Sequence, residues 1–222
     1  MITIPAIALR GMTLLPGMVA HFDISRDKSI KAVEAAMNDN QKIYLVTQRD
    51  PDIDDPILED LYEVGIVAEI KQVIKMQNNI VRVLAEGSAR AKIHGFAECE
   101  SYLSAEVEEL EEVEEFLPDA VKSAMKKSIR DNFIRFTKIH GKISPEAIKQ
   151  VNGIDDLIKL INFVSNTLPI GYTDKQRILE ANSVNERYEV LLALLFREID
   201  VMVIQKDFQD KVKQRVDKNQ KD

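Results

Sequence analysis

The segment Tyr102–Asp119, "YLSAEVEELEEVEEFLPD", separates two parts of the sequence that have different hydrophobic periods. Apolar and polar residues alternate up to Val107, which is typical of a half-exposed strand. Apolar residues then recur at every third position among glutamates, at Val107, Leu110, Val113 and Phe116, before Pro118 ends the pattern. The change of period predicts a strand-rich domain over residues 1–117 and a helical domain over residues 118–222.

On the N-terminal side of this segment, short apolar runs predict strands over residues 2–9, 19–24, 42–48, 61–76 and 80–86. Asn78-Asn79 separates the last two runs and suits a hairpin turn, because asparagine tolerates positive φ. Between the second and third runs, apolar residues fall at helical spacing, at Ile30, Val33, Ala36 and Met37. We therefore expect a sheet or barrel with one short helix.

On the C-terminal side, helix start and stop signals punctuate several amphipathic stretches. Gly141 closes a first helix, and Ser144 precedes Pro145 as the N-cap of a second. Thr173 is placed to cap a later helix. Ser183 begins the last one in the capping-box sequence "SVNE". These signals predict a helical bundle.

The last helix carries a broad apolar face made by Val190, Leu191, Leu194, Leu195, Ile199, Met202 and Val203. Beyond Ile204 this face thins to Phe208, Val212 and Val216 among charged residues. No glycine or proline interrupts it, so about 36 residues at ~1.5 Å each would span ~54 Å. We expect its distal part to be a solvated arm or coiled-coil seam through which copies of the chain associate, and we expect the sequence to end inside a helix, as a fragment would.

The composition places the chain among globular proteins. It has 222 residues, 45% of them hydrophobic, and a formal charge of −7. Cys99 is its only cysteine, so no internal disulfide forms, and no membrane span or signal peptide is recognisable. We expect a cytoplasmic protein that does not bind membranes. The acidic balance disfavours nucleic-acid binding, which needs a basic face.

The sequence offers little that is typical of catalysis or metal binding. The acidic run Asp50–Asp55 lacks the glycine and glutamate of an EF-hand loop and contains stiffening prolines, so a solvated loop is the better interpretation. His21, His94, His140 and Cys99 have no partners at ligand or nucleophile spacing. We therefore predict no catalytic residue and no metal site.

The segment "LRGMTLLPGM", Leu9–Met18, combines a Pro-Gly turn with unusually apolar neighbours, namely Met12, Leu14, Leu15 and Met18. These side chains could fold back into the core, which physical reasoning alone favours. They could instead form an exposed apolar patch, which usually marks a binding site. Methionine is flexible, so Met12 and Met18 would suit a surface that meets many sequences.

Five segments, "IPAIALRGMTLLPGM", "KSIKAVEAAM", "IYLVTQRDPDIDDP", "LYEVGIVAEIKQ" and "VRVLAEGSARAKI", together resemble the N-terminal domain of the bacterial Lon protease. "LPIGYTDKQRILEANSVNERYEVLLALLFREIDVM" followed by "KVKQRVDKNQK" resembles the helical segment that follows it. Two positions depart from the family: Gly11, where an acidic residue is frequent, and Leu15, where phenylalanine is common. The resemblance implies an α+β fold, with a PUA-like β-barrel or sheet domain and a short helix before a helical bundle that ends in a long C-terminal helix.

The resemblance also implies a role. The family is an ATP-dependent serine protease that forms hexamers and degrades misfolded and regulatory proteins. Its later modules carry the ATP and Mg²⁺ site and a Ser-Lys dyad, so this fragment would be non-catalytic and without a cofactor of its own. It would bind unfolded or misfolded polypeptide through an outward-facing Met12, Leu14, Leu15 and Met18. It would self-associate through Phe208, Val212 and Val216, as a dimer or monomer in isolation. The alternatives are a stand-alone binding module of the same kind and, with less support, an RNA-binding PUA-like protein.

Overall fold

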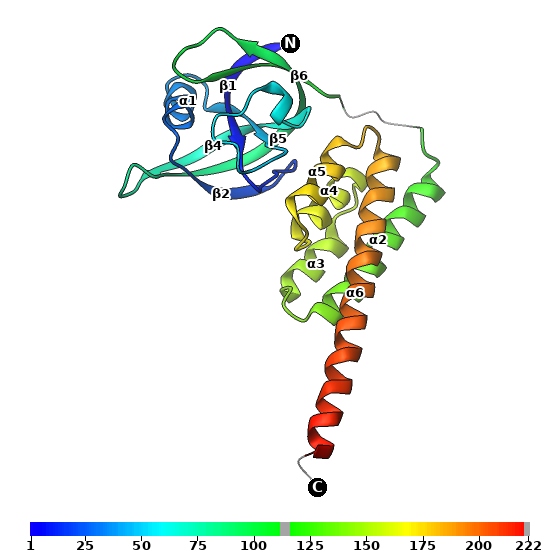
Figure 1. Ribbon diagram of the computed structural model, residues 1–222. Helices are drawn as coiled ribbons and strands as arrows, with labels where there is room; N and C mark the ends of the chain where they lie inside the picture. The colour runs from blue at the N-terminus through cyan, green and yellow to red at the C-terminus, as the bar shows by residue number, and fades with distance from the viewer. Residues whose placement is uncertain (112–115, 220–222) are drawn as a thin grey trace. The chain divides into compact units, whose positions relative to one another are not determined.

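The computed structural model describes residues 1–111 and 116–219, with side chains described up to residue 213 (Figure 1). The chain divides into two compact units. The strand-rich unit comprises Met1–Val113 together with Leu168–Asn182, and the helical unit comprises Glu114–Thr167 and Ser183–Asp222. Residues Leu168–Asn182 fall within the range expected for a helical domain but pack with the strands. The division into a strand-rich domain over residues 1–117 and a helical domain over residues 118–222 stays a prediction.

The strand-rich unit is built on one mixed sheet of six strands, β1 Ile2–Leu9, β2 Val19–Ile24, β3 Lys42–Thr47, β4 Val64–Lys75, β5 Val81–Ala97 and β6 Leu103–Glu109. β1 pairs with β3 in parallel and with β6 in antiparallel fashion. β3–β4, β4–β5 and β5–β6 are antiparallel, so five strands form a closed ring. β2 lies outside the ring and pairs with β5. The unit also contains α1 Asp27–Asn38, the 3-10 turn Leu58–Asp60 and α5 Tyr172–Glu180.

The predicted hairpin joins β4 and β5. Asn78 and Asn79 have φ angles of +60° and +57°, the signs that a type I′ turn requires at its two central positions. The N–H of Ile80 donates to the carbonyl of Gln77 at 3.4 Å and closes the turn, and the N–H of Met76 donates to the carbonyl of Ile80 at 2.8 Å beside it. The prediction from the asparagine pair is confirmed.

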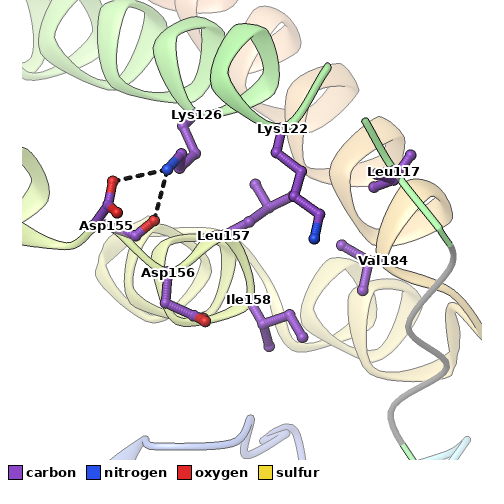
Figure 2. A pocket seen from close by; sticks show the side chains of 8 residues that line it. All are labelled: Leu117, Lys122, Lys126, Asp155, Asp156, Leu157, Ile158 and Val184. Carbon is purple, nitrogen blue, oxygen red and sulfur yellow. Dashed lines mark hydrogen bonds and ion pairs between the residues drawn. The ribbon is translucent and has the colours of Figure 1, made fainter. Parts of the chain in front are cut away.

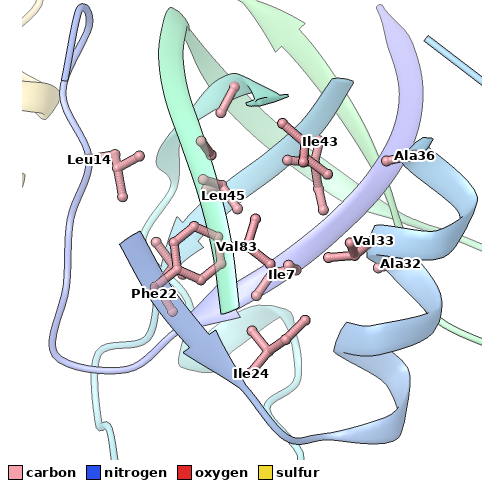
Figure 3. Close-up of a cluster of buried hydrophobic side chains, with 14 of the residues drawn as sticks. Ile7, Leu14, Phe22, Ile24, Ala32, Val33, Ala36, Ile43, Leu45 and Val83 are labelled. Carbon is pink, nitrogen blue, oxygen red and sulfur yellow. The ribbon is translucent and has the colours of Figure 1, made fainter. Parts of the chain in front are cut away.

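The main core of this unit lies between α1 and the concave face of the sheet (Figure 3). α1 contributes Ala32, Val33 and Ala36, which are at most 2% exposed. Strand residues whose side chains point to this face of the sheet complete the core, among them Ile7, Phe22, Ile43, Leu45, Ile66 and Val83. A second cluster on the other side of the sheet gathers around Tyr44, Val67 and Val107. Because both faces are covered, β1 and β3 are almost continuously apolar.

The helical unit contains α2 Asp119–His140, α3 Pro145–Gly153, α4 Leu157–Thr167 and α6 Val184–Asn219. Gly141 ends α2 with φ +70°. Ser144 accepts a hydrogen bond from the N–H of Ala147 at 3.3 Å, and Ser183 accepts one from the N–H of Glu186 at 3.2 Å, as the cap signals predict. The expectation for Thr173 is wrong: α5 begins at Tyr172 with Gly171 as its N-cap, so Thr173 lies inside the helix.

α6 packs on the helical unit only through its first half. Leu191, Leu194, Leu195 and Ile199 are at most 2% exposed, whereas the helix continues past the other helices of its unit (Figure 1). The predicted α+β fold is confirmed: a six-stranded mixed sheet with a short helix precedes helices that end in a long C-terminal one. In the described part of the chain, no helix is both long and apolar enough to cross a membrane.

Candidate functional site

The loop between β1 and β2 is held in one conformation by its own backbone. The N–H of Met18 donates to the carbonyl of Leu15 at 3.0 Å, and Gly17 has φ +73°, as a type II turn with Pro16 at its second position requires. Gly17 donates to the carbonyl of Gly87 on β5, and the N–H of Gly87 donates to the carbonyl of Met18, each at 2.9 Å. The Pro-Gly turn is therefore docked against β5.

The four apolar side chains of this loop do not behave alike. Leu14 and Leu15 are each 1% exposed, and Leu14 points from the loop toward the main core (Figure 3). The expectation that these two leucines face outward is wrong, because the docked turn directs both of them inward. Met12 and Met18 are half-buried and pack against the edge of the same core.

Val19, which the sequence interpretation missed, follows the turn and is 57% exposed. Its exposure follows from the alternation in β2, whose even-numbered residues Ala20, Phe22 and Ile24 are buried. That alternation is visible in "VAHFDI" and could have identified it. The apolar surface of the loop therefore consists of Met12, Met18 and Val19, and we call these three residues the loop patch.

A buried polar network fixes the base of the loop. Thr13 and Thr47 share a hydrogen bond between their hydroxyl oxygens at 2.7 Å, and Thr47 donates to the carbonyl of Met12 at 2.9 Å. Gln176 of α5 inserts beside them, with its Oε1 3.4 Å from the hydroxyl oxygen of Thr13, and donates to the carbonyl of Val64 at 2.8 Å. Gln176 is only 1% exposed, so α5 helps to hold the loop patch in place.

A hollow of about 120 Å³ lies between the C-terminal ends of β1 and β2, and Met12 forms part of its wall. Arg10 and Arg26 also line it. Arg10 pairs with Asp54 at 2.6 Å and Arg26 donates to Gln48. Burial lowers the pKa of Arg26, and the nearby charge of Arg10 lowers that pKa further.

The residues considered as catalytic or metal-binding candidates do not come together in one site. His21 is exposed on β2, His94 contacts Glu108 at 2.9 Å, His140 stacks on Phe136, and Cys99 is exposed. In the acidic loop Asp50–Asp55, Asp54 pairs with Arg10 and Asp55 with Lys28. Over residues 1–111 and 116–219, no three His, Cys, Asp or Glu side chains converge as a metal site would require.

The residues expected to mediate association lie on the projecting part of α6. Phe208 is 64% exposed and Val212 is 60% exposed. The side chain of Val216 lies outside the described residues. Val201 and Ile204, which are 42% and 54% exposed, extend the same apolar stripe toward the body of the helical unit. The described part of this stripe has no partner within its unit to explain its apolar composition.

A second hollow, of about 330 Å³, lies within the helical unit near the start of α4 (Figure 2). Leu117, Leu157, Ile158 and Val184 supply its apolar wall. Lys126 is tied to Asp155 through the carboxylate and the main-chain carbonyl, at 2.7 and 2.9 Å, whereas the ammonium group of Lys122 points into the opening. Sequence reasoning did not identify this hollow, because its residues come from three separated segments, 117–126, 155–158 and Val184.

Comparison with known proteins decides the family. Residues 3–197 match the family described as "ATP-dependent protease La (LON) substrate-binding domain". The chain belongs to this family. The match reaches into both units and ends within α6, and the resemblance noted from the sequence is confirmed.

Relatives and solved structures agree with this assignment. A Lon protease of Lachnoclostridium phytofermentans is 41% identical over 99% of this chain, and one of Escherichia coli is 35% identical over all of it. The chain spans 27% and 28% of these two relatives. The N-terminal domain of the Mycobacterium avium complex Lon protease superposes with a TM-score of 0.71 at 22% identity, covering 87% of this chain and 97% of that one. A Lon N-terminal domain protein from Xanthomonas campestris gives a TM-score of 0.60 at 13% identity. These two structures share the fold of the LON substrate-binding domain.

Proposed function

We propose that this chain is the part of an ATP-dependent serine protease that captures unfolded polypeptide, working in the cytoplasm on misfolded and regulatory proteins. The observation that carries the proposal is the loop patch: Val19 is exposed and Met12 and Met18 are half-exposed, on a backbone fixed by the Pro-Gly turn. The family description, which names a substrate-binding domain, supports it.

The loop patch would act by weak apolar contact. Unfolded segments expose the apolar side chains that folded proteins bury, and methionine adapts its shape to many of them. The buried Leu14 and Leu15 have a different role in this proposal from the one expected of them: they anchor the loop so that the patch does not collapse into the core. Several such patches on one oligomer would gain affinity by avidity.

Assembly is the second part of the proposal. The exposed stripe that includes Phe208 and Val212, continued in the sequence by Val216, would pack against a second copy of the chain as a coiled coil. ATP, Mg²⁺ and the peptide-cleaving residues would belong to other modules of the whole protease, and this part would not be catalytic. The nearest alternative is a stand-alone binding module of the same family; RNA binding is disfavoured by the charge of −7.

The loop patch is tested by a triple variant, Met12→Ser with Met18→Ser and Val19→Ser. We expect it to bind a reduced, carboxymethylated protein, which cannot refold, about tenfold more weakly, because losing ~1.4 kcal/mol of apolar contact costs a factor of ten. Fluorescence anisotropy of the labelled unfolded protein gives the affinity. The control is Met37→Ser with Ile57→Ser, which removes apolar side chains that are 38% and 61% exposed elsewhere on the same unit.

Thermal unfolding followed by circular dichroism keeps the comparison valid: both variants should melt cooperatively, the triple variant at a somewhat lower temperature because Met12 and Met18 also pack against the core. A triple variant that binds with the parent's affinity would contradict the proposal, as would a control that weakens binding equally. Leu14→Ala should behave differently and lower the free energy of unfolding by about 2–5 kcal/mol, as a buried leucine does.

A further inference from the structure

Among the described strands, β2 has one edge that is free along its whole length. Each of the other five named strands has a neighbour on both sides, because β1, β3, β4, β5 and β6 close into a ring. β2 pairs with β5 on one side, and within the described part of the chain no strand pairs with its other side. Figure 1 shows it at the rim of the strand-rich unit. An unpaired edge is a template for another extended chain.

The register shows which main-chain groups of β2 point away from the sheet. The N–H of Gly87 donates to the carbonyl of Met18, and β5 pairs with β2 through Ala20↔Ala85, Phe22↔Val83 and Ile24↔Val81. Hydrogen-bonded pairs alternate along an antiparallel ladder, so these even-numbered residues bond to β5. The carbonyl of Ile80, one residue before β5, accepts from the N–H of Met76 on the β4 side. The even-numbered main-chain groups at this end of β5 therefore point toward β4, and the odd-numbered ones point toward β2.

The main-chain N–H and C=O groups that point outward are therefore those of Val19, His21 and Asp23. Hydrogen bonds from the described residues reach none of these groups. The side chains of these three residues are exposed as well, so the rest of β2 does not cover the outward main-chain groups. Three residues spaced two apart offer donors and acceptors at the repeat of a strand.

The edge also lacks the features that usually protect one. "VAHFDI" contains no proline and no lysine or arginine, the residues by which edge strands avoid pairing. Its one acidic residue, Asp23, is engaged by Arg82 through two hydrogen bonds of 2.7 and 2.8 Å. Arg82 also lowers the pKa of the Asp23 carboxyl, which therefore stays ionised and paired.

Apolar surface lies at both ends of this edge. Met18 and Val19 of the loop patch stand at its start. At its far end lies the hollow of about 120 Å³, lined by Met12, Phe22 and Ile24. A strand laid along β2 would direct every second side chain toward one face of the sheet, so alternate residues could contact these apolar groups.

We propose that an extended segment of unfolded polypeptide binds by adding to β2 as a further strand, through hydrogen bonds to the main chain of Val19, His21 and Asp23. The inference rests on the proposed function and specifies its mode. Main-chain groups are the same in every sequence, so strand addition holds many different unfolded chains while it rejects folded ones, whose strands are already paired. The loop patch then contributes side-chain affinity at the two ends of the edge, through Met18 and Val19 at its start and Met12 at its far end.

The test uses His21→Pro in the whole 222-residue chain, with His21→Ala as its matched control. Proline removes the outward N–H of residue 21 and places its ring on the free edge, where the ladder to β5 needs no donor. Both variants should therefore fold. We expect His21→Pro to bind the reduced, carboxymethylated protein about tenfold more weakly and His21→Ala to bind it unchanged.

Amide hydrogen exchange measured by NMR supplies the readout that is specific to strand addition. Adding the unfolded protein should slow exchange at Val19, His21 and Asp23, whereas Ala20, Phe22 and Ile24 should be slow with or without it. Binding with no change at the three odd-numbered amides would overturn strand addition and leave the proposed function standing. Failure of the parent chain to bind would instead remove the proposed function.

The alternative occupant of the free edge of β2 is a second copy of the chain, which would pair through its own β2. In that case, the odd-numbered amides would become protected as the chain is concentrated without any unfolded protein, and His21→Pro would lower the sedimentation coefficient. Either result would overturn the proposal. A His21→Pro variant that binds as well as His21→Ala would overturn it too.

Discussion

Gly87 is the residue on which the position of the β1–β2 loop depends most directly. A Cβ atom added there would lie 2.5 Å from Cδ1 of Ile66 and 2.6 Å from the carbonyl oxygen of Leu15. These are distances that real side chains do not adopt, and the carbonyl belongs to the turn that Gly87 also binds. The close approach of β5 to the loop therefore requires glycine.

We predict that Gly87→Ala lowers the free energy of unfolding by about 1–3 kcal/mol, the usual cost of overpacking a core. The matched control is Gly153→Ala at the end of α3, where an added Cβ meets nothing within 4 Å. It should be neutral or stabilising, because alanine favours a helix more than glycine does. Urea unfolding followed by circular dichroism measures both, and equal stabilities would show that the loop can move away from β5.

At the scale of helices and strands, turn and cap residues in the sequence predicted the structure well where they act through the backbone. Asn78-Asn79, Gly141 and Ser144 each act on the dihedral angles or hydrogen bonds of their own neighbours, and each prediction is confirmed. The burial of Leu14 and Leu15 depends instead on Gly87 and α5, which are distant in the sequence. No local pattern carries that information, so the sequence identified the loop but not which of its side chains reach the surface.

At the same scale, the projecting part of α6 predicts weak self-association. Phe208→Ser with Val212→Ser should shift the chain toward monomer in sedimentation velocity across a range of concentrations. Because both side chains are at least 60% exposed, the variant should melt like the parent. A chain ending at residue 203 should match the variant. Unchanged sedimentation in both would contradict a coiled-coil role for this helix.

For the molecule as a whole, the main question is whether the strands can fold without α5. Gln176 bonds the carbonyl of Val64, and the carbonyl of Leu179 accepts from Nε of Arg90 at 2.8 Å. Both Gln176 and Arg90 are at most 2% exposed. Losing α5 would leave buried polar groups of the strands without these partners, at about 1–3 kcal/mol for each group.

We predict that a chain limited to residues 1–117 unfolds at lower urea concentration than the strand-rich unit of the whole chain. Hydrogen exchange at β4 amides, read by mass spectrometry, measures that unit separately. Gln176→Ala in the whole chain should show part of the same loss by removing one of the contacts. If residues 1–117 are as well protected as the whole chain, they form an independent domain and α5 is dispensable.

The return of Leu168–Asn182 to the strands also has a consequence for how the protein is made. On the ribosome, all six strands are synthesised before α5, with α2, α3 and α4 between them. Until α5 emerges, the nascent sheet lacks the helix that fixes Thr13 and the base of the loop. Under the proposed function, the loop patch would be held firmly enough to bind unfolded polypeptide only after most of the helical segment has been translated, so half-made chains would not yet bind it.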